Sequence, residues 1–163
     1  MVIKNTALTW LVGIASISLL AAVAVYCFAR SYPPEVLEPF KVGGIGLAAY
    51  PAIFGSAPSF FYTLALCLII GAFASNRSTA ILHCFLWIGL ALFLELTQHS
   101  IFAGSFSIWL PRVLPESTWF LIGSYWTQGV FDPIDLATSL VGGLIALLLI
   151  THLPMEKKNA GSL

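Results

Sequence analysis

Two apolar runs joined by four polar residues decide the fold: PSFFYTLALCLIIGAFA at 58–74, SNRS at 75–78 and TAILHCFLWIGLALFLEL at 79–96. A helix that crosses a bilayer needs about 20 apolar residues, within a range of roughly 17–25. So short a link joins only helices that lie antiparallel and side by side. The stretch therefore predicts a transmembrane helical hairpin, with Ser78 as the N-cap of its second helix.

Two more apolar runs, at 7–29 and 133–153, flank the hairpin. The 163-residue chain is 59% hydrophobic and only 9% charged, and its mean hydropathy is +0.95. We therefore predict one all-α integral membrane domain over 1–163, with four transmembrane helices. The rival interpretation of the first run is a cleaved signal peptide, with Lys4 in its positively charged N-terminal region. The run is longer than the 7–15 apolar residues typical of such a peptide.

The charges and cysteines exclude other classes of protein. Seven basic and seven acidic residues give a formal net charge of zero, so no basic surface is expected and no nucleic acid partner is predicted. The three cysteines, Cys27, Cys67 and Cys84, all lie inside apolar runs. An odd number of cysteines in such runs predicts free thiols rather than a disulfide framework.

Basic residues indicate an orientation for the four expected helices, which would place both termini on one side. That side would carry Lys4, Arg77, Lys157 and Lys158, and the other side Arg30, Lys41 and Arg112. Because cytoplasmic segments carry an excess of Lys and Arg, this distribution favours cytoplasmic termini.

The two long connections differ in composition. Residues 30–57 contain four prolines, and their apolar part at 42–54 is too short to span, which predicts an interfacial or re-entrant piece. The connection at 100–131 holds Trp109, Trp119 and Trp126. Since indole rings prefer the headgroup level, we expect PESTWFLIGSYW at 115–126 to form a short interfacial amphipathic helix. The alternative is an aromatic platform that binds carbohydrate or lipid.

Small side chains predict where helices pack closely. The run at 58–74 and the residue after it carry a stripe four residues apart: Ser59, Thr63, Cys67, Gly71 and Ser75. The run at 133–153 has small residues at the same spacing, Ser139 and Gly143, with Gly142 beside them. Small residues on one face let helices approach, so we expect Gly71 to pack against Gly143. No histidine stands at a spacing that would make these serines catalytic.

The stretch FDPID at 131–135 has a structural explanation. Asp132 precedes a proline, which favours the first helical position, so Asp132 is predicted to be the N-cap of the last helix. Asp135 then falls at the third helical position, where its carboxylate can reach back to the Asp132 amide.

Glu95 is harder to explain by a purely structural role at a helix end. It lies in the last turn of its run, where a negative charge is disfavoured by the helix dipole. An ionisable group in or near a bilayer is by default a functional hypothesis. In an antiparallel arrangement the end of the run at 79–96 and the start of the run at 133–153 meet at the same side of the membrane. We therefore predict a functional cluster on the outer side, formed by Glu95, Gln98, His99, Gly129, Asp132 and Asp135.

These residues carry a family resemblance. Glu95-x-x-Gln98, Gly129 followed by Asp132-x-x-Asp135, and Gly142-Gly143 are similar to the motifs of VanZ-like membrane proteins. The resemblance covers 56–153 and implies a small multi-pass protein of the bacterial cytoplasmic membrane. Some members of the family are linked to resistance to glycopeptide antibiotics such as teicoplanin.

The chain departs from the family pattern at four places. Val130 stands where the family has an arginine, and Tyr62 where a histidine is often found. Ser139 or Thr138 replaces an asparagine, and the stretch between Gln98 and Gly129 is longer than in the family. The missing arginine weakens the anion-binding role that the motif would otherwise imply.

Two functions follow as hypotheses. The first is a non-catalytic envelope protein that binds a lipid or a cell-wall precursor at the acidic cluster and affects glycopeptide susceptibility. The alternative is an integral-membrane enzyme that acts on a lipid-linked substrate, with the carboxylates and His99 as acid–base groups. A transporter is disfavoured, because the middles of the runs lack charged residues. Membrane lipids are the expected partners, and no spacing predicts a metal or another cofactor.

Overall fold

The computed structural model describes residues 2–3, 5–28, 40, 55–123, 126, 129–152 and 155–156. Its helices are α1 (Asn5–Phe28), α3 (Ala57–Phe73), α4 (Arg77–Thr97), α5 (Ser100–Val113), α6 (Glu116–Ile122) and α8 (Pro133–His152). A two-residue strand lies near each terminus, β1 (Val2–Ile3) and β2 (Met155–Glu156). The predicted all-α fold is therefore confirmed, apart from this one short strand pair.

Three helices, α1, α4 and α8, are long and apolar enough to cross a membrane. Helix α3 is equally apolar but has only 17 residues, which at 1.5 Å per residue extend about 26 Å. The four helices begin and end within two residues of the predicted runs at 7–29, 58–74, 79–96 and 133–153. The apolar runs in the sequence therefore gave reliable helix boundaries.

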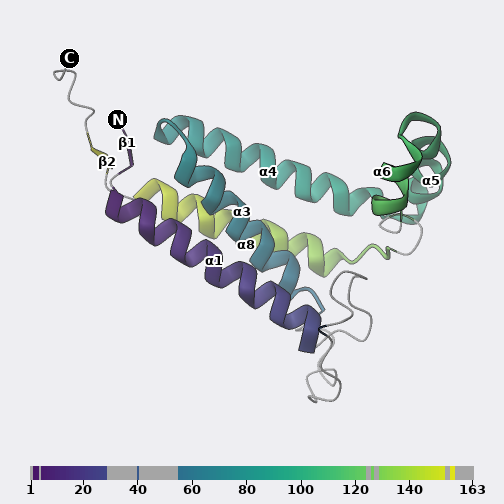
Figure 1. Ribbon diagram of the computed structural model, residues 1–163, viewed down its shortest axis with the longest axis horizontal. Helices are drawn as coiled ribbons and strands as arrows, with labels where there is room; N and C mark the ends of the chain where they lie inside the picture. The colour runs from purple at the N-terminus through teal and green to yellow at the C-terminus, as the bar shows by residue number, and fades with distance from the viewer. Residues whose placement is uncertain are drawn as a thin grey trace.

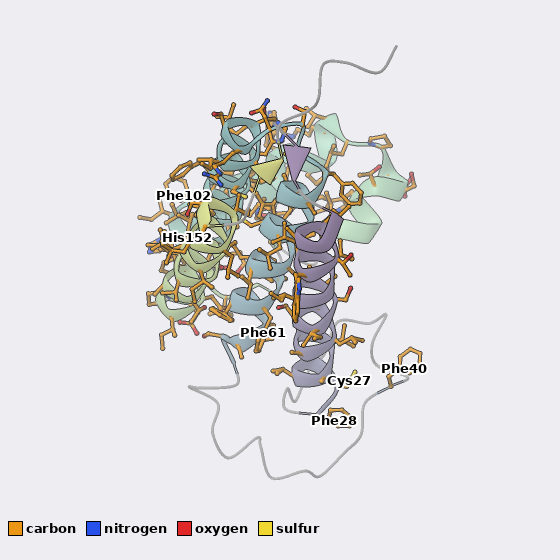
Figure 2. The ribbon with its side chains drawn as sticks, turned by 90° about the vertical axis from the view of Figure 1, so that its left-hand side faces the viewer. Cys27, Phe28, Phe40, Phe61, Phe102 and His152 are labelled. Carbon is orange, nitrogen blue, oxygen red and sulfur yellow. The ribbon has the colours of Figure 1, made fainter. Side chains whose placement is uncertain are left out.

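The bundle is built around α3, which contacts α1, α4 and α8, while α4 also contacts α8 (Figure 1). Consecutive helices of this bundle run in opposite directions, so α8 returns parallel to α3. Both chain ends then lie at one end of the bundle, where β1 pairs antiparallel with β2. Cys27 and Phe28 mark the opposite end of α1 (Figure 2).

Small side chains allow the close approach of α3 and α8. A Cβ added at Gly142 would lie 2.5 Å from the Phe60 carbonyl oxygen, and one at Gly71 would lie 2.5 Å from Cδ1 of Ile150. Gly71 thus faces α8, but through Ile150 rather than the expected Gly143. Gly143 instead faces Ile88 of α4. Neighbouring residues on a helix point about 100° apart. Gly142 of α8 therefore allows the close approach of α3, and Gly143 allows that of α4.

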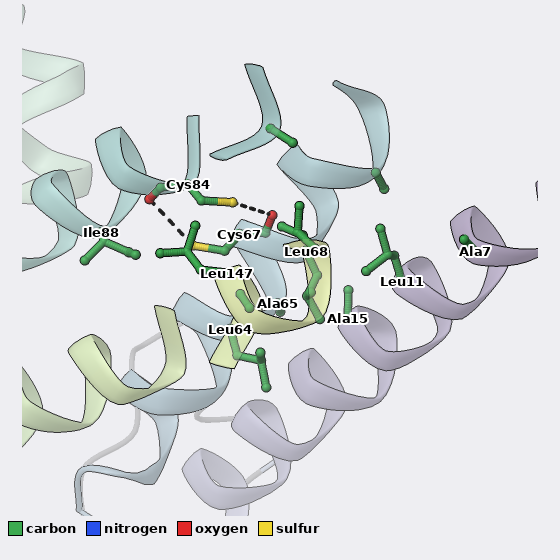
Figure 3. Packing of buried hydrophobic residues seen from close by; sticks show 14 residues of the cluster. Ala7, Leu11, Ala15, Leu64, Ala65, Cys67, Leu68, Cys84, Ile88 and Leu147 are labelled. Carbon is green, nitrogen blue, oxygen red and sulfur yellow. Dashed lines mark hydrogen bonds between the residues drawn. The ribbon is translucent and has the colours of Figure 1, made fainter. Parts of the chain in front are cut away.

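Two buried cysteines join α3 to α4 at the centre of the hairpin (Figure 3). The Cys84 thiol donates to the Cys67 carbonyl oxygen over 3.3 Å, and the Cys67 thiol points back to the Cys84 carbonyl over 3.9 Å. Cys27 is also buried, and all three thiols are free, as predicted. The thiols of Cys67 and Cys84 satisfy their weak donors on the backbone of the neighbouring helix.

Several local expectations were wrong or incomplete. The N-cap of α4 is Asn76, whose side chain accepts from the Thr79 amide at 2.9 Å, and not Ser78. The helix predicted at 115–126 is shorter, since α6 ends at Ile122. Helix α5 was not predicted. The expected re-entrant piece at 42–54 lies outside the described residues, as do Lys157 and Lys158.

Candidate functional site

Three helix ends meet at the end of the bundle that lies opposite the β1–β2 pair. Because α4 runs antiparallel to α3 and α8, its last turn lies beside their first turns. The hydroxyl of Thr138 donates to the Ser56 carbonyl oxygen at 3.2 Å, and that of Ser139 donates to the Ser59 carbonyl oxygen at 3.4 Å. We call this region, with Tyr62, Glu95, Asp132 and Asp135, the polar end of the bundle.

Glu95 is the most buried acidic side chain at the polar end, with only 8% of its surface exposed. Its Oε1 accepts a hydrogen bond from the backbone amide of Asp132 at 3.3 Å. That amide precedes the first turn of α8, so the carboxylate lies at the positive end of the α8 dipole. This position offsets its unfavourable place at the end of α4, by up to about 2 kcal/mol in partly buried geometry.

Asp132 caps α8, as the sequence predicted. Its Oδ1 accepts from the Ile134 amide at 2.8 Å, and its carbonyl oxygen accepts from the Leu136 amide at 3.3 Å. The sequence predicted that the Asp135 carboxylate would accept a hydrogen bond from the backbone amide of Asp132. In the structure that amide donates to Glu95. Asp132 therefore belongs both to the start of α8 and to the environment of Glu95.

Tyr62 lies near two of the carboxylates, on the α3 side. Its half-buried phenol interacts with the Ser139 hydroxyl and lies within electrostatic reach of both Glu95 and Asp135. The Oδ1 atom of Asp135 is itself buried. The sequence drew attention to Tyr62 only as a replacement for a histidine, and this replacement was the one signal that could have placed it in the cluster.

The remaining predicted residues lie at the turns that follow α4 and precede α8. Gln98 is the C-cap of α4, and its backbone N–H donates to the carbonyl oxygens of Glu95 and Leu96. His99 is the N-cap of α5, where its Nδ1 accepts from the Ile101 amide at 3.4 Å. Its ring meets the Phe131 ring edge-on at a centroid distance of 5.1 Å. Gly129 is half-buried two residues before Phe131.

An aromatic stack holds α5 and α6 beside the polar end. The Trp126 ring lies nearly parallel to Phe106 of α5 and to Trp119 of α6, with centroids 6.1 and 6.5 Å away. The Trp126 indole N–H donates to the Thr97 hydroxyl at 3.0 Å, and that hydroxyl donates to the Leu94 carbonyl oxygen. Trp119 and Trp126 are therefore half-buried in this stack, whereas Trp109 is exposed.

Comparison of the chain with protein-family models, curated proteins and solved structures finds no match in any of the three. The chemistry must therefore be argued from the residues themselves. Glu95, Asp132 and Asp135 supply carboxylate oxygens and Tyr62 a phenol, while Val130, which is 81% exposed, adds no positive charge. Such a group of side chains attracts cations and hydrogen-bond donors and repels phosphate.

Two further observations concern possible ligands. Among the described residues, no group of three or more His, Cys, Asp or Glu side chains could hold a metal ion. A shallow, mainly apolar hollow is lined by Ile70, His83, Leu86, Trp87 and Leu90, on α3 and α4. Its lining residues are not those of the polar end, so the hollow is separate from the candidate site.

Proposed function

We propose that the chain is a four-span, VanZ-like protein of a bacterial cytoplasmic membrane, with its termini in the cytoplasm and its polar end facing outward. In this proposal α3 spans together with α1, α4 and α8. Its length of 17 residues is at the lower limit for a spanning helix. The three helices packed around it shield it from lipid and so reduce the cost of a short span.

The basic residues and the position of the termini support this orientation. The β1–β2 pair brings both chain ends together, and Arg77 at the start of α4 lies at the same end of the bundle. An excess of Lys and Arg is typical of cytoplasmic segments. The polar end, at the opposite ends of these helices, would then face outward.

We further propose that the polar end binds a lipid or a cell-wall precursor, and that this binding affects glycopeptide susceptibility. One observation carries the proposal: the Glu95 carboxylate is buried where three helix ends meet. Burying a carboxylate costs free energy, and a glutamine would avoid the cost of a charge at the same size. The acidic environment favours the hydroxyl or amino groups of a headgroup over its phosphate.

The alternative, an integral-membrane enzyme that acts on a lipid-linked substrate with the carboxylates and His99 as acid–base groups, has weaker support. The Nδ1 atom of His99 accepts a hydrogen bond from the Ile101 amide, and its ring packs on Phe131. Both contacts are typical of a structural residue at the start of a helix, and so they favour the first proposal.

The test is Glu95→Gln, scored by glycopeptide susceptibility of cells that express the protein, beside the amount of protein in the membrane. We expect Glu95→Gln to abolish the change in susceptibility while the amount of protein is unchanged. A comparison variant for folding is Asp132→Asn, which should fold normally because Asn caps as well as Asp. Full activity of Glu95→Gln at normal abundance would show that the charge has no functional role.

A further inference from the structure

Helix α5 presents an apolar face that the described part of the chain leaves uncovered. Five large apolar side chains of α5 are 48–71% exposed: Ile101, Phe102, Ile108, Trp109 and Val113. Spacings of seven and eight residues place them on one side of the helix, which we call the outer face of α5. Phe106 and Leu110 are half-buried at one edge of this face, where Phe106 packs parallel to Trp126.

The outer face of α5 continues the apolar surface of α4. Near its end, α4 exposes Phe93 by 54% and Leu96 by 43%. The Phe93 ring meets the Phe106 ring edge-on at 6.5 Å, so α5 packs beside an exposed side of α4. Figure 1 shows α5 and α6 at the far end of α4, away from α1. Since α4 is apolar enough to cross a membrane, its exposed side and the adjoining outer face meet the same surroundings.

The charge on this face fits a phospholipid surface. Arg112 lies in the last turn of α5, is exposed, and is four residues from Ile108 on the same side of the helix. A guanidinium forms strong hydrogen bonds with phosphate, while its aliphatic stem can cover apolar surface. An exposed indole, Trp109, beside a basic residue is the usual composition of a helix at the membrane interface.

We propose that α5 lies in the plane of the membrane interface, with its outer face in the phospholipid leaflet at the polar end and Arg112 at the phosphate level. Trp109 is then the aromatic anchor of the 100–131 connection, because Trp119 and Trp126 are half-buried and stack with one another. The inference shares the membrane placement of the proposed function, but it does not depend on the ligand of the acidic cluster.

The experiment places single nitroxide labels by Ile108→Cys, Ser117→Cys and Phe85→Cys in protein reconstituted into liposomes of phosphatidylcholine and phosphatidylglycerol. Ser117 is an exposed polar residue of α6, and Phe85 is exposed on α4. The unsubstituted chain is the labelling blank, since its three thiols are buried. Collisions with oxygen report lipid exposure, and collisions with a water-soluble nickel chelate report water exposure.

We expect the label at 108 to behave like the label at 85, accessible to oxygen and protected from nickel, while the label at 117 shows the reverse. Nickel access at 108 equal to that at 117 would overturn the proposal. So would spin–spin broadening at 108 that disappears on dilution with unlabelled protein, because a second copy would then cover the face. Protection from both reagents would mean that the chain itself covers it. Nickel access at 85 would instead remove the membrane placement itself.

Discussion

Gly142 should be the glycine of α8 that least tolerates a larger side chain. In Gly142→Ala the new Cβ would lie 2.5 Å from the Phe60 carbonyl oxygen, whereas ordinary contacts begin near 3.4 Å. The neighbour is backbone and cannot rotate away, so α3 and α8 would have to separate by about 0.9 Å, the difference between the two distances. This movement would also strain the Ser139–Ser59 hydrogen bond, already 3.4 Å long.

Overpacking of this kind costs about 1–3 kcal/mol, which lowers the ratio of folded to unfolded protein about 5- to 140-fold. For a chain of this length, 1 kcal/mol corresponds to about 2–4 °C in the unfolding midpoint. We therefore expect Gly142→Ala to lower the midpoint by about 2–12 °C. The assay is thermal unfolding in detergent. The folded fraction is measured as the fraction of the protein that still elutes as a folded species on size exclusion.

The chain supplies its own controls. A Cβ at Gly89 of α4 would meet nothing within 4 Å, so Gly89→Ala should be neutral or gain up to about 1 kcal/mol from helix propensity. At Gly71 the obstacle is Cδ1 of Ile150 at 2.5 Å, and at Gly143 the obstacles are Cγ1 and Cδ1 of Ile88 at 2.4 and 2.5 Å. These are side-chain rather than backbone atoms, so they can move by rotation of the side chain, at a cost of about 0.5–1.5 kcal/mol for an off-rotamer angle. Equal stability of the Gly142→Ala and Gly89→Ala variants would refute the close approach of α3 and α8 that this reasoning assumes.

Three further predictions follow from the contacts described above. Asp132→Ala should lower stability by about 1 kcal/mol through loss of the cap bond to Ile134, and an unchanged unfolding midpoint would show that this bond is unimportant. Trp126→Phe should keep the aromatic stack but lose the bond to Thr97, at about 1 kcal/mol, whereas Trp126→Ala should cost clearly more in the same assay. A membrane-impermeant thiol reagent added to intact cells should label Ser117→Cys and not Ser75→Cys, and the reverse result would invert the proposed orientation.

The sequence was most informative where local chemistry decides the structure. Apolar run lengths predicted the limits of four helices, and the order of Asp132 and Pro133 predicted the start of α8, because capping depends on adjacent residues. Helix α5 escaped prediction, since its 14 residues mix glycine, serine and an internal Pro111 with apolar side chains. The sequence therefore lacks the continuous apolar run that identified the other helices.

The candidate site shows the other limit of sequence reasoning. The dipole argument singled out Glu95, which does lie in the last turn of α4, but it could not find the amide that binds its carboxylate. The amide that binds the carboxylate is 37 residues away in the chain, and Tyr62 reaches the same place from a third helix. Likewise, which residue of α8 faces Gly71 depends on how α8 is rotated about its own axis between α3 and α4. The spacing of residues along the sequence does not determine that rotation.

The parallel contact between α3 and α8 has a consequence for how the chain is made. Their hydrogen bonds join residues 80 and 82 positions apart. At a synthesis rate of 5–20 residues per second, α3 would wait roughly 4–16 s for its partner to leave the ribosome. During that time the hairpin of α3 and α4 can form, but the Phe60 backbone and the Gly71 side of α3 stay uncovered. A nascent chain stalled before α8 should therefore be a substrate for membrane chaperones and proteases until its last helix arrives.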